Sequence, residues 1–265
     1  MAKTNVAKMV WQEAKEFAER NAVVLVPLGN VEPSGRHSVM GGEIFIADYV
    51  ADGVAAKTGS FRLPTLPFGY CPTFMGFPGT VTLQAATLEA ILYDICHSLV
   101  RHGFDHICIV DNHSGNEGVI EQAARRVKAD HGVLLANMLL PPIMRAVSKD
   151  LYPDLAAVHG HGGEPGVSAR LYLCPEDMRL DLAASAGETR GSYHGLPVSN
   201  TTVKHGGASW TLYLDFGDTN PTGGTGDASQ ASAARGKVIL DRMVDFGAEV
   251  IEQFRTIPTR LPAAR

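Results

Sequence analysis

The stretch VVLVPLGNVEPSGRHSVMGGE, residues 23–43, joins an apolar run to a polar loop interrupted by glycines. Its first part, Val23 to Leu28, is continuously apolar and rich in β-branched residues, which is typical of a strand buried on both faces of a sheet. The loop that follows contains Glu32, His37 and Glu43, and no helix is predicted to hold them. Carboxylates and an imidazole placed directly after a buried strand indicate a functional site.

Further apolar runs and helical patterns extend this strand into a sheet. Strands are predicted at 105–112 and 133–139, and helices that end at a glycine are predicted at 86–103 and 116–132. Alternating strands and helices at this spacing are typical of parallel βαβ units with helices on both faces of the sheet. We therefore predict a three-layer α/β/α fold with a mainly parallel central sheet, formed as a single domain over residues 1–265.

The two ends of the chain have helical patterns of their own. Residues 1–20 lack the apolar core of a signal peptide. They are predicted instead to form an amphipathic helix. Residues 227–254 are predicted to form a long closing helix, with Asp227 as a candidate N-cap. The segment 140–226 is predicted to be rich in loops.

Composition excludes several classes of function. The chain has 265 residues and a net charge of −5, without a basic cluster that would favour nucleic acid as a partner. There is no apolar run of about 18 residues, so no membrane span is predicted. The four cysteines are widely spaced and form no CxxC pair, which favours reduced thiols and a cytoplasmic location.

Polar residues gather where the predicted strands end. In open parallel sheets, ligands bind at the carboxyl ends of the strands. Glu32 follows the first strand, and DNHSGN (111–116) follows the second. The later loop HGHGGE (159–164) adds His159, His161 and Glu164. Carboxylates mixed with imidazoles suit Zn²⁺ or Mn²⁺, which can polarise a carbonyl and lower the pKa of a bound water.

Each of these residues also has a plainer interpretation. A glutamate in a loop is usually solvated, a histidine after a strand is often a structural hydrogen-bonding group, and GHGG can be a flexible loop. Spacing alone leaves these alternatives open. The aromatic residues Phe74, Phe77, Trp210 and Tyr213 are likewise either core residues or walls of a pocket.

Five segments of the chain resemble motifs of the creatininase (creatinine amidohydrolase) family, in the same order. The first, GNVEPSGRHSVMGGE (29–43), resembles the family form GS-(I/V)-EQHG-PHLP-LGTD. The others are GFPGTVTL (76–83), HGFDHICIVDNHSGN (102–116), GHGGEPGVS (160–168) and GTGDASQASAARGKVIL (224–240). The resemblance runs over almost the whole chain, and it implies a metal-dependent α/β hydrolase.

The resemblance also implies roles for individual residues. Glu32, Glu43 and His113 correspond to metal ligands, and Glu164 corresponds to a further metal-site residue with a part in catalysis. His161 corresponds to a histidine that transfers a proton to the leaving group. Around them, we expect a set of substrate contacts at Ser34, Arg36, His37, Asn116 and His159.

Four positions depart from the family pattern. Ser34 stands where the family has a ligand histidine, next to Pro33 in place of a glutamine, and Gly115 stands where creatininase has a carboxylate ligand. Glu43 replaces an aspartate and is longer by one methylene. We therefore expect one firm site for Zn²⁺ or Mn²⁺ and a second site that is weak or absent. These departures argue against creatinine as the substrate.

Three hypotheses for function remain open. The first is a metal-dependent hydrolase that opens a small cyclic amide by breaking a C–N bond. The second is hydrolysis of a C–C bond in a cyclic ketone such as a keto-inositol, and the third is a non-catalytic family member that binds a small molecule. By resemblance, the chain is expected to form a homo-oligomer, a hexamer built from dimers, with soft support from the apolar stretch LLPPIM (139–144).

Overall fold

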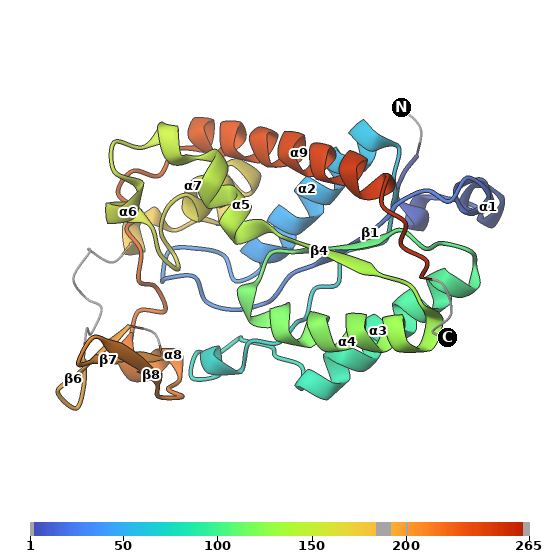
Figure 1. Ribbon diagram of the computed structural model, residues 1–265. Helices are drawn as coiled ribbons and strands as arrows, with labels where there is room; N and C mark the ends of the chain where they lie inside the picture. Colours follow the sequence, from blue (N-terminus) through green and yellow to red (C-terminus); the bar gives the residue numbers. More distant parts are fainter. Residues whose placement is uncertain (1–2, 184–191, 200, 262–265) are drawn as a thin grey trace.

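The computed structural model describes residues 3–183, 192–199 and 201–261 (Figure 1). At its centre lies a four-stranded sheet with the order β2-β1-β3-β4, in which every pair of neighbours is parallel. The strands are β1 (Val24–Leu28), β2 (Phe61–Arg62), β3 (Ile107–Asp111) and β4 (Leu135–Leu139). Leu28 pairs with Asp111 at the carboxyl ends of β1 and β3, so the loops after these two strands start side by side.

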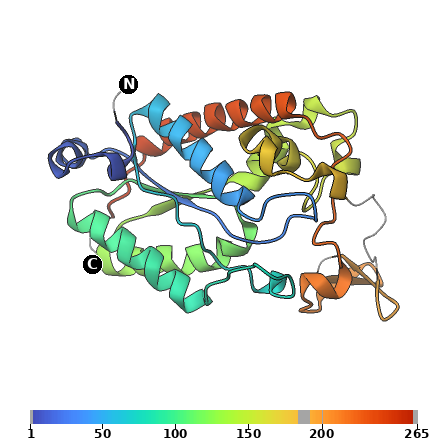
Figure 2. The same ribbon diagram turned by 180° about the vertical axis from the view of Figure 1, so that it is seen from behind.

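Helices cover both faces of this sheet, which confirms the predicted α/β/α fold (Figures 1 and 2). One face is covered by α2 (Gly42–Thr58), α5 (Leu140–Val147), α7 (Gly166–Leu173) and α9 (Ala233–Arg255). The other is covered by α3 (Ala85–Arg101) and α4 (Glu117–His131), with α1 (Trp11–Glu19) packed beside them. Alternate residues of β1 enter the two layers: Leu25 packs in the first core and Val26 in the second.

The helix ends follow the sequence signals in some places and not in others. Gly132 adopts φ 65° after α4, as expected for a glycine that ends a helix. The closing helix α9, however, begins at Ala233, where the Ser232 side chain accepts a hydrogen bond from Arg235 N. The prediction that Asp227 is the N-cap is therefore wrong, because its carboxylate accepts hydrogen bonds from Ser229 within a preceding turn.

Two other predicted segments differ from the structure. The stretch 139–144, expected to be an exposed apolar loop, is largely the start of α5, and Leu140 and Met144 are buried in the core. That stretch therefore gives no support for an oligomer, which stays a prediction from resemblance. The N-terminal helix is shorter than predicted: a 3-10 turn at Val6–Lys8 precedes α1.

A second, antiparallel sheet lies in the segment predicted to be rich in loops (Figure 1). Its strands are β5 (Ser192–Tyr193), β6 (Leu196–Ser199), β7 (Thr202–His205) and β8 (Ala208–Thr211), next to the short helix α8 (Phe216–Thr219). Val198, Val203 and Leu214 form its small core. Trp210 and Tyr213 are exposed, so they belong to neither the main core nor the pocket described below.

The four cysteines are free and buried, as predicted for reduced thiols. None of the helices in the described ranges is long and apolar enough to cross a membrane.

Candidate metal centre

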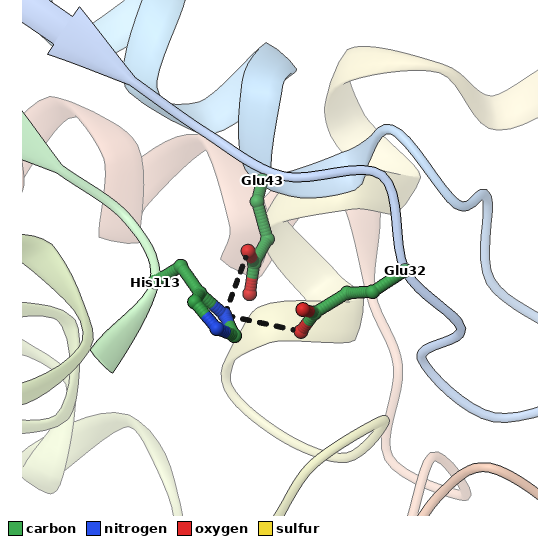
Figure 3. A group of neighbouring side chains, drawn as sticks. All are labelled: Glu32, Glu43 and His113. Carbon is green, nitrogen blue, oxygen red and sulfur yellow. Dashed lines mark ion pairs between the residues drawn. The ribbon is translucent and has the colours of Figure 1, made fainter. Parts of the chain in front are cut away.

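Three buried side chains from separate segments meet at the carboxyl end of the sheet (Figure 3). His113 Nδ1 lies 3.2 Å from Glu32 Oε1 and 3.2 Å from Glu43 Oε2. One potential ligand atom from each residue lies within 4.8 Å of the other two. Within the described ranges, this is the one group of three or more histidine, cysteine or carboxylate side chains with such spacing.

The fold explains why these three residues converge. Glu32 lies in the loop after β1 and His113 in the loop after β3, and these adjacent parallel strands end in register. Glu43 is in the first turn of α2, which packs against β1. The sequence predicts a loop without a helix at Glu43, so its position in the first turn of α2 corrects that expectation.

The backbone around His113 is fixed by the end of β3. The Asp111 carboxylate accepts hydrogen bonds from His113 N at 3.1 Å and from Asn116 Nδ2 at 2.9 Å. Asn116 in turn accepts a hydrogen bond from Tyr70 N at 2.8 Å. Burial raises the pKa of Asp111 to about 6, although both of these hydrogen bonds act in the opposite direction. This network fixes the backbone from which the His113 side chain projects.

The electrostatics of the three groups are those of a site that binds positive charge. Burial, together with the charge of Glu32, raises the pKa of Glu43 to about 7. Burial acts against protonation of His113, but the two carboxylates outweigh it and raise the pKa of the imidazole well above its usual value. For Glu32, the interactions with His113 outweigh burial and lower the pKa. A proton or a metal ion is therefore needed to balance the buried carboxylates.

The donor atoms fit a divalent metal ion. Glu32 Oε1 and Glu43 Oε2 are buried, and among the described residues their polar contact is the ion pair with His113 Nδ1, without a hydrogen bond of good geometry. Buried carboxylate oxygens are normally hydrogen-bonded or bound to a metal, so these two are available as ligands. Two carboxylates and one imidazole, with room for a further ligand, suit Zn²⁺ and also Mn²⁺.

His161 lies in the same pocket as the three potential ligands. Its Nε2–H donates a hydrogen bond to the Pro33 carbonyl at 2.6 Å, because a carbonyl can only accept. The ring stacks on Phe74, with centroids 4.8 Å apart. Burial lowers the pKa of His161, so the ring is neutral near pH 7, with Nδ1 as its basic nitrogen.

Glu164 is buried beside this group, and both of its oxygens accept hydrogen bonds. Oε2 accepts from the Tyr152 hydroxyl at 2.8 Å, and Oε1 accepts from Ser168 Oγ at 2.9 Å. Glu164 lines the same pocket as Glu32, but it is not in the group of three ligand atoms. Its part in metal binding or catalysis stays a prediction.

Removing one donor from Glu164 is expected to destabilise the protein. Tyr152→Phe deletes a hydroxyl that bonds a buried carboxylate, and we expect the free energy of unfolding to fall by about 1–3 kcal/mol. Urea unfolding monitored by circular dichroism measures this change. Tyr172→Phe is the matched control, because no hydrogen bond of the Tyr172 hydroxyl occurs within the described ranges. Equal stability of the two variants would contradict the expectation.

The five predicted substrate contacts lie in different surroundings. Ser34 is buried and His159 is exposed, and both line the pocket. His37 is buried and Arg36 is exposed, and neither belongs to the residues that line the pocket. The amide of Asn116 is used by Tyr70 and Asp111, as described above. Their contact with substrate stays a prediction.

The sequence interpretation missed one side chain of the pocket wall, Arg170 of α7. This residue is 7% exposed, and its Nη1 donates a hydrogen bond to Ser34 Oγ at 2.7 Å. Ser34 and Arg170 are 136 residues apart in the chain, and no motif links them. An arginine in an apolar helix such as VSARLYL was the only available signal, since a charge there must find a partner.

The centre forms the wall of a cavity of about 260 Å³. Its lining includes the three potential ligands together with Ser34, Phe74, Asn112, His159, His161, Glu164 and Arg170. Phe74 is thus a pocket wall, one of the two roles predicted for it. A cavity of this size admits a small molecule.

Comparison with known proteins gives consistent matches over nearly the whole chain. A family model described as creatinine amidohydrolase matches residues 7–251. The chain is 27% identical to a creatinine amidohydrolase of Pseudomonas putida, over 94% of this chain and 96% of that protein. It is 26% identical to a mycofactocin precursor peptide peptidase of Mycolicibacterium smegmatis (88% and 85% covered). It is 23% identical to a 3-dehydro-scyllo-inosose hydrolase of Thermotoga maritima (97% and 84% covered).

Solved structures agree in fold. A crystal structure of creatinine amidohydrolase (creatininase) matches with a TM-score of 0.80 at 24% identity, covering 97% of this chain and 100% of that one. A creatininase described with Mn matches with a TM-score of 0.78 at 24% identity, covering 96% and 99%. A creatininase variant described as Zn–Zn type gives 0.75 at 23% identity, with the same coverage. At these identities the likeness shows the fold.

Proposed function

Because the chain belongs to the creatinine amidohydrolase (creatininase) family, we propose that it is a hydrolase that uses one divalent metal ion to open a small cyclic amide. The observation that carries this proposal is the buried group of Glu32, Glu43 and His113, with His161 in the same pocket. Glu32 Oε1 and Glu43 Oε2 accept no hydrogen bond of good geometry within the described ranges, and a cation held between them and His113 would satisfy both buried oxygens.

Glu32, Glu43 and His113 would hold the metal, either Zn²⁺ or Mn²⁺. When bound, the ion would supply Lewis-acid polarisation of the substrate carbonyl and lower the pKa of a water molecule. The chain itself orients the donors: Asp111 fixes the backbone of His113, and Asn30 Nδ2 donates a hydrogen bond to Glu32 Oε2 at 3.3 Å. Neither hydrogen bond uses Glu32 Oε1 or His113 Nδ1, so these two atoms stay available to a metal ion.

His161 is assigned the proton transfer. Hydrolysis of a cyclic amide breaks the C–N bond, adds the hydroxyl of water to the carbonyl carbon and adds a proton to the nitrogen. Its Nε2–H is held by the Pro33 carbonyl, so Nδ1 is the nitrogen that can take the proton of water and deliver it to the leaving nitrogen. The lowered pKa of the buried ring keeps Nδ1 free to accept a proton near pH 7.

A second candidate function is hydrolysis of a cyclic ketone, with cleavage of a C–C bond. It is favoured by the similarity to a 3-dehydro-scyllo-inosose hydrolase, which extends over 97% of this chain. The same metal ligands would serve it, because a ketone can also be polarised by a cation. A non-catalytic binding role is disfavoured by the retained polar group and by the hydrolase relatives.

Substrate panels separate these alternatives. The metal-loaded protein is assayed against cyclic amides, keto-cyclitols and short peptides, with ring opening or cleavage followed by mass spectrometry. The proposal expects turnover of at least one cyclic amide at a higher kcat/KM than any keto-cyclitol or peptide. The reverse order would favour one of the other classes, and a ligand recovered unchanged in every case would favour a binding protein.

Metal removal is expected to abolish this activity reversibly. Dialysis against a chelator should lower activity to background, and addition of Zn²⁺ or Mn²⁺ should restore it, because Glu32, Glu43 and His113 would hold the ion that the reaction needs. Metal content is measured by mass spectrometry at each step. Protein purified without chelator that contains less than about 0.2 equivalents of transition metal, yet remains active, would contradict the proposal.

A further inference from the structure

A buried guanidinium lies against the metal centre, and it is not accounted for by the metal ligands or by the proton transfer. Arg170 is 7% exposed and lines the same cavity as Glu32 and Glu43. Its Nη1 donates to Ser34 Oγ at 2.7 Å, whereas its Nε has no acceptor within the described ranges. A buried charge is costly unless it is compensated, so this charge needs a reason.

The fold makes a specific place for the side chain of Arg170. A Cβ added to Gly42 would lie 2.3 Å from Arg170 Nε and 2.5 Å from its Cδ. The arginine therefore crosses directly over the first turn of α2, one residue before Glu43. Only a residue without a side chain leaves room for this path. The neighbouring Gly41 carries no such restriction, because its added Cβ would make ordinary contacts of 3.6 Å or more.

The charges of the centre are not balanced by a single ion alone. The three carboxylates that line the pocket, Glu32, Glu43 and Glu164, carry −3 beside a neutral imidazole, and one divalent metal reduces this sum to −1. Arg170 adds one positive charge, because a guanidinium stays protonated even where burial lowers its pKa. Glu43 and Glu32 are the main opposing charges that act on Arg170. With one metal ion bound, Arg170 therefore brings the pocket to charge balance, and a second divalent ion would leave two positive charges in excess.

We propose that Arg170 is the second positive charge of this centre, a fixed cation that limits it to one metal ion and stabilises negative charge developing on the substrate oxygen. This rests on the proposed function and deepens it. A second divalent ion would face a buried guanidinium whose repulsion is weakly screened by water. An oxygen that gains negative charge during hydrolysis would be attracted by a cation that needs no reorganisation.

The first test compares wild type with Arg170→Gln and Arg170→Lys. Metal stoichiometry is measured by mass spectrometry, and metal affinity by competition with a chelating dye. Wild type should bind about one equivalent. Arg170→Gln should bind the metal at least about tenfold more tightly, because a like charge has been removed. Its kcat should nevertheless fall by about 10²–10³. Arg170→Lys keeps the charge and should lie between the two.

The second test moves the guanidinium without removing it. Gly42→Ala places a methyl group where Arg170 passes, so the arginine must shift. Gly41→Ala adds the same atom one residue earlier, without a close contact. We expect Gly42→Ala to lower kcat by at least about tenfold with the metal retained, and Gly41→Ala to behave like wild type. This pair remains informative if Arg170→Gln does not fold.

Several results would overturn this inference and leave the proposed function intact. Tight binding of two equivalents of metal by wild type would contradict the limit to one ion. Weaker metal binding by Arg170→Gln would mean that Arg170 only holds Glu43 in position. Unchanged kcat in both Arg170→Gln and Gly42→Ala would exclude a role in the reaction. Absence of metal binding by wild type, in contrast, would overturn the proposed function itself.

Discussion

His113→Ala is expected to remove the metal and the hydrolytic activity together. His113 supplies the only nitrogen of the three-ligand group, and its Nδ1 lies 3.2 Å from both carboxylates. Loss of a residue that merely supports a ligand typically costs 10–100-fold in metal affinity, so we expect loss of the ligand itself to cost more than about 100-fold. The two remaining carboxylates would then be buried without a nitrogen partner.

The measurement is metal content after gel filtration, together with kcat/KM at saturating added metal. His102→Ala is a suitable control, because His102 is exposed at the end of α3 and should leave both quantities unchanged. His113→Ala with one full equivalent of tightly bound metal would show that the ion is held elsewhere. Activity that survives loss of the metal would contradict a metal-dependent reaction.

His161→Ala is expected to separate catalysis from metal binding. The ring of His161 is not in the ligand group, and its Nε2 is already used by the Pro33 carbonyl. We therefore expect the metal content to stay near that of wild type, while kcat falls by about 10²–10⁴, the usual contribution of general acid–base catalysis. In wild type, protonation of His161 should lower kcat as the pH falls. In His161→Ala, this part of the pH profile of kcat should be absent.

A matched variant distinguishes proton transfer from local structure. In His161→Gln, the side-chain amide nitrogen can reach the place of Nε2 and still donate a hydrogen bond to the Pro33 carbonyl, but it cannot take up a proton. We expect it to be more stable than His161→Ala to heat and equally slow in the assay. Recovery of activity in His161→Gln would assign the residue to positioning. Loss of metal from both variants would mean that His161 belongs to the ligand group.

Much of the frame of this centre could be predicted from short segments. The strands that become β1 and β3 are continuous apolar runs, and burial on both faces is the only way to satisfy such runs. Polar residues directly after two adjacent parallel strands must lie at one edge of the sheet. The sequence therefore predicted that Glu32 and His113 can face one pocket, although it predicted neither α2 nor β2, which lie between β1 and β3 in the chain.

Other features depend on contacts between distant segments. The antiparallel sheet β5–β8 has short strands without a strong alternating pattern, and its residues gain their order from packing on one another. The choice of Ser232 as the cap of α9 depends on the path of the preceding turn, where Asp227 already accepts hydrogen bonds. Contacts of this kind form only in the folded chain, so composition and periodicity do not predict them.

The sequence by itself determined the parallel α/β/α frame and the edge of the sheet where the potential metal ligands gather, because apolar periodicity and the polar residues at the strand ends are properties of neighbouring residues. Only the tertiary structure decided what surrounds those ligands. It gave both oxygens of Glu164 to Tyr152 and Ser168, and it brought Arg170 against Ser34 across 136 residues of chain. Such partners are chosen by packing, since a buried charge bonds to whatever polar group the folded chain places within reach.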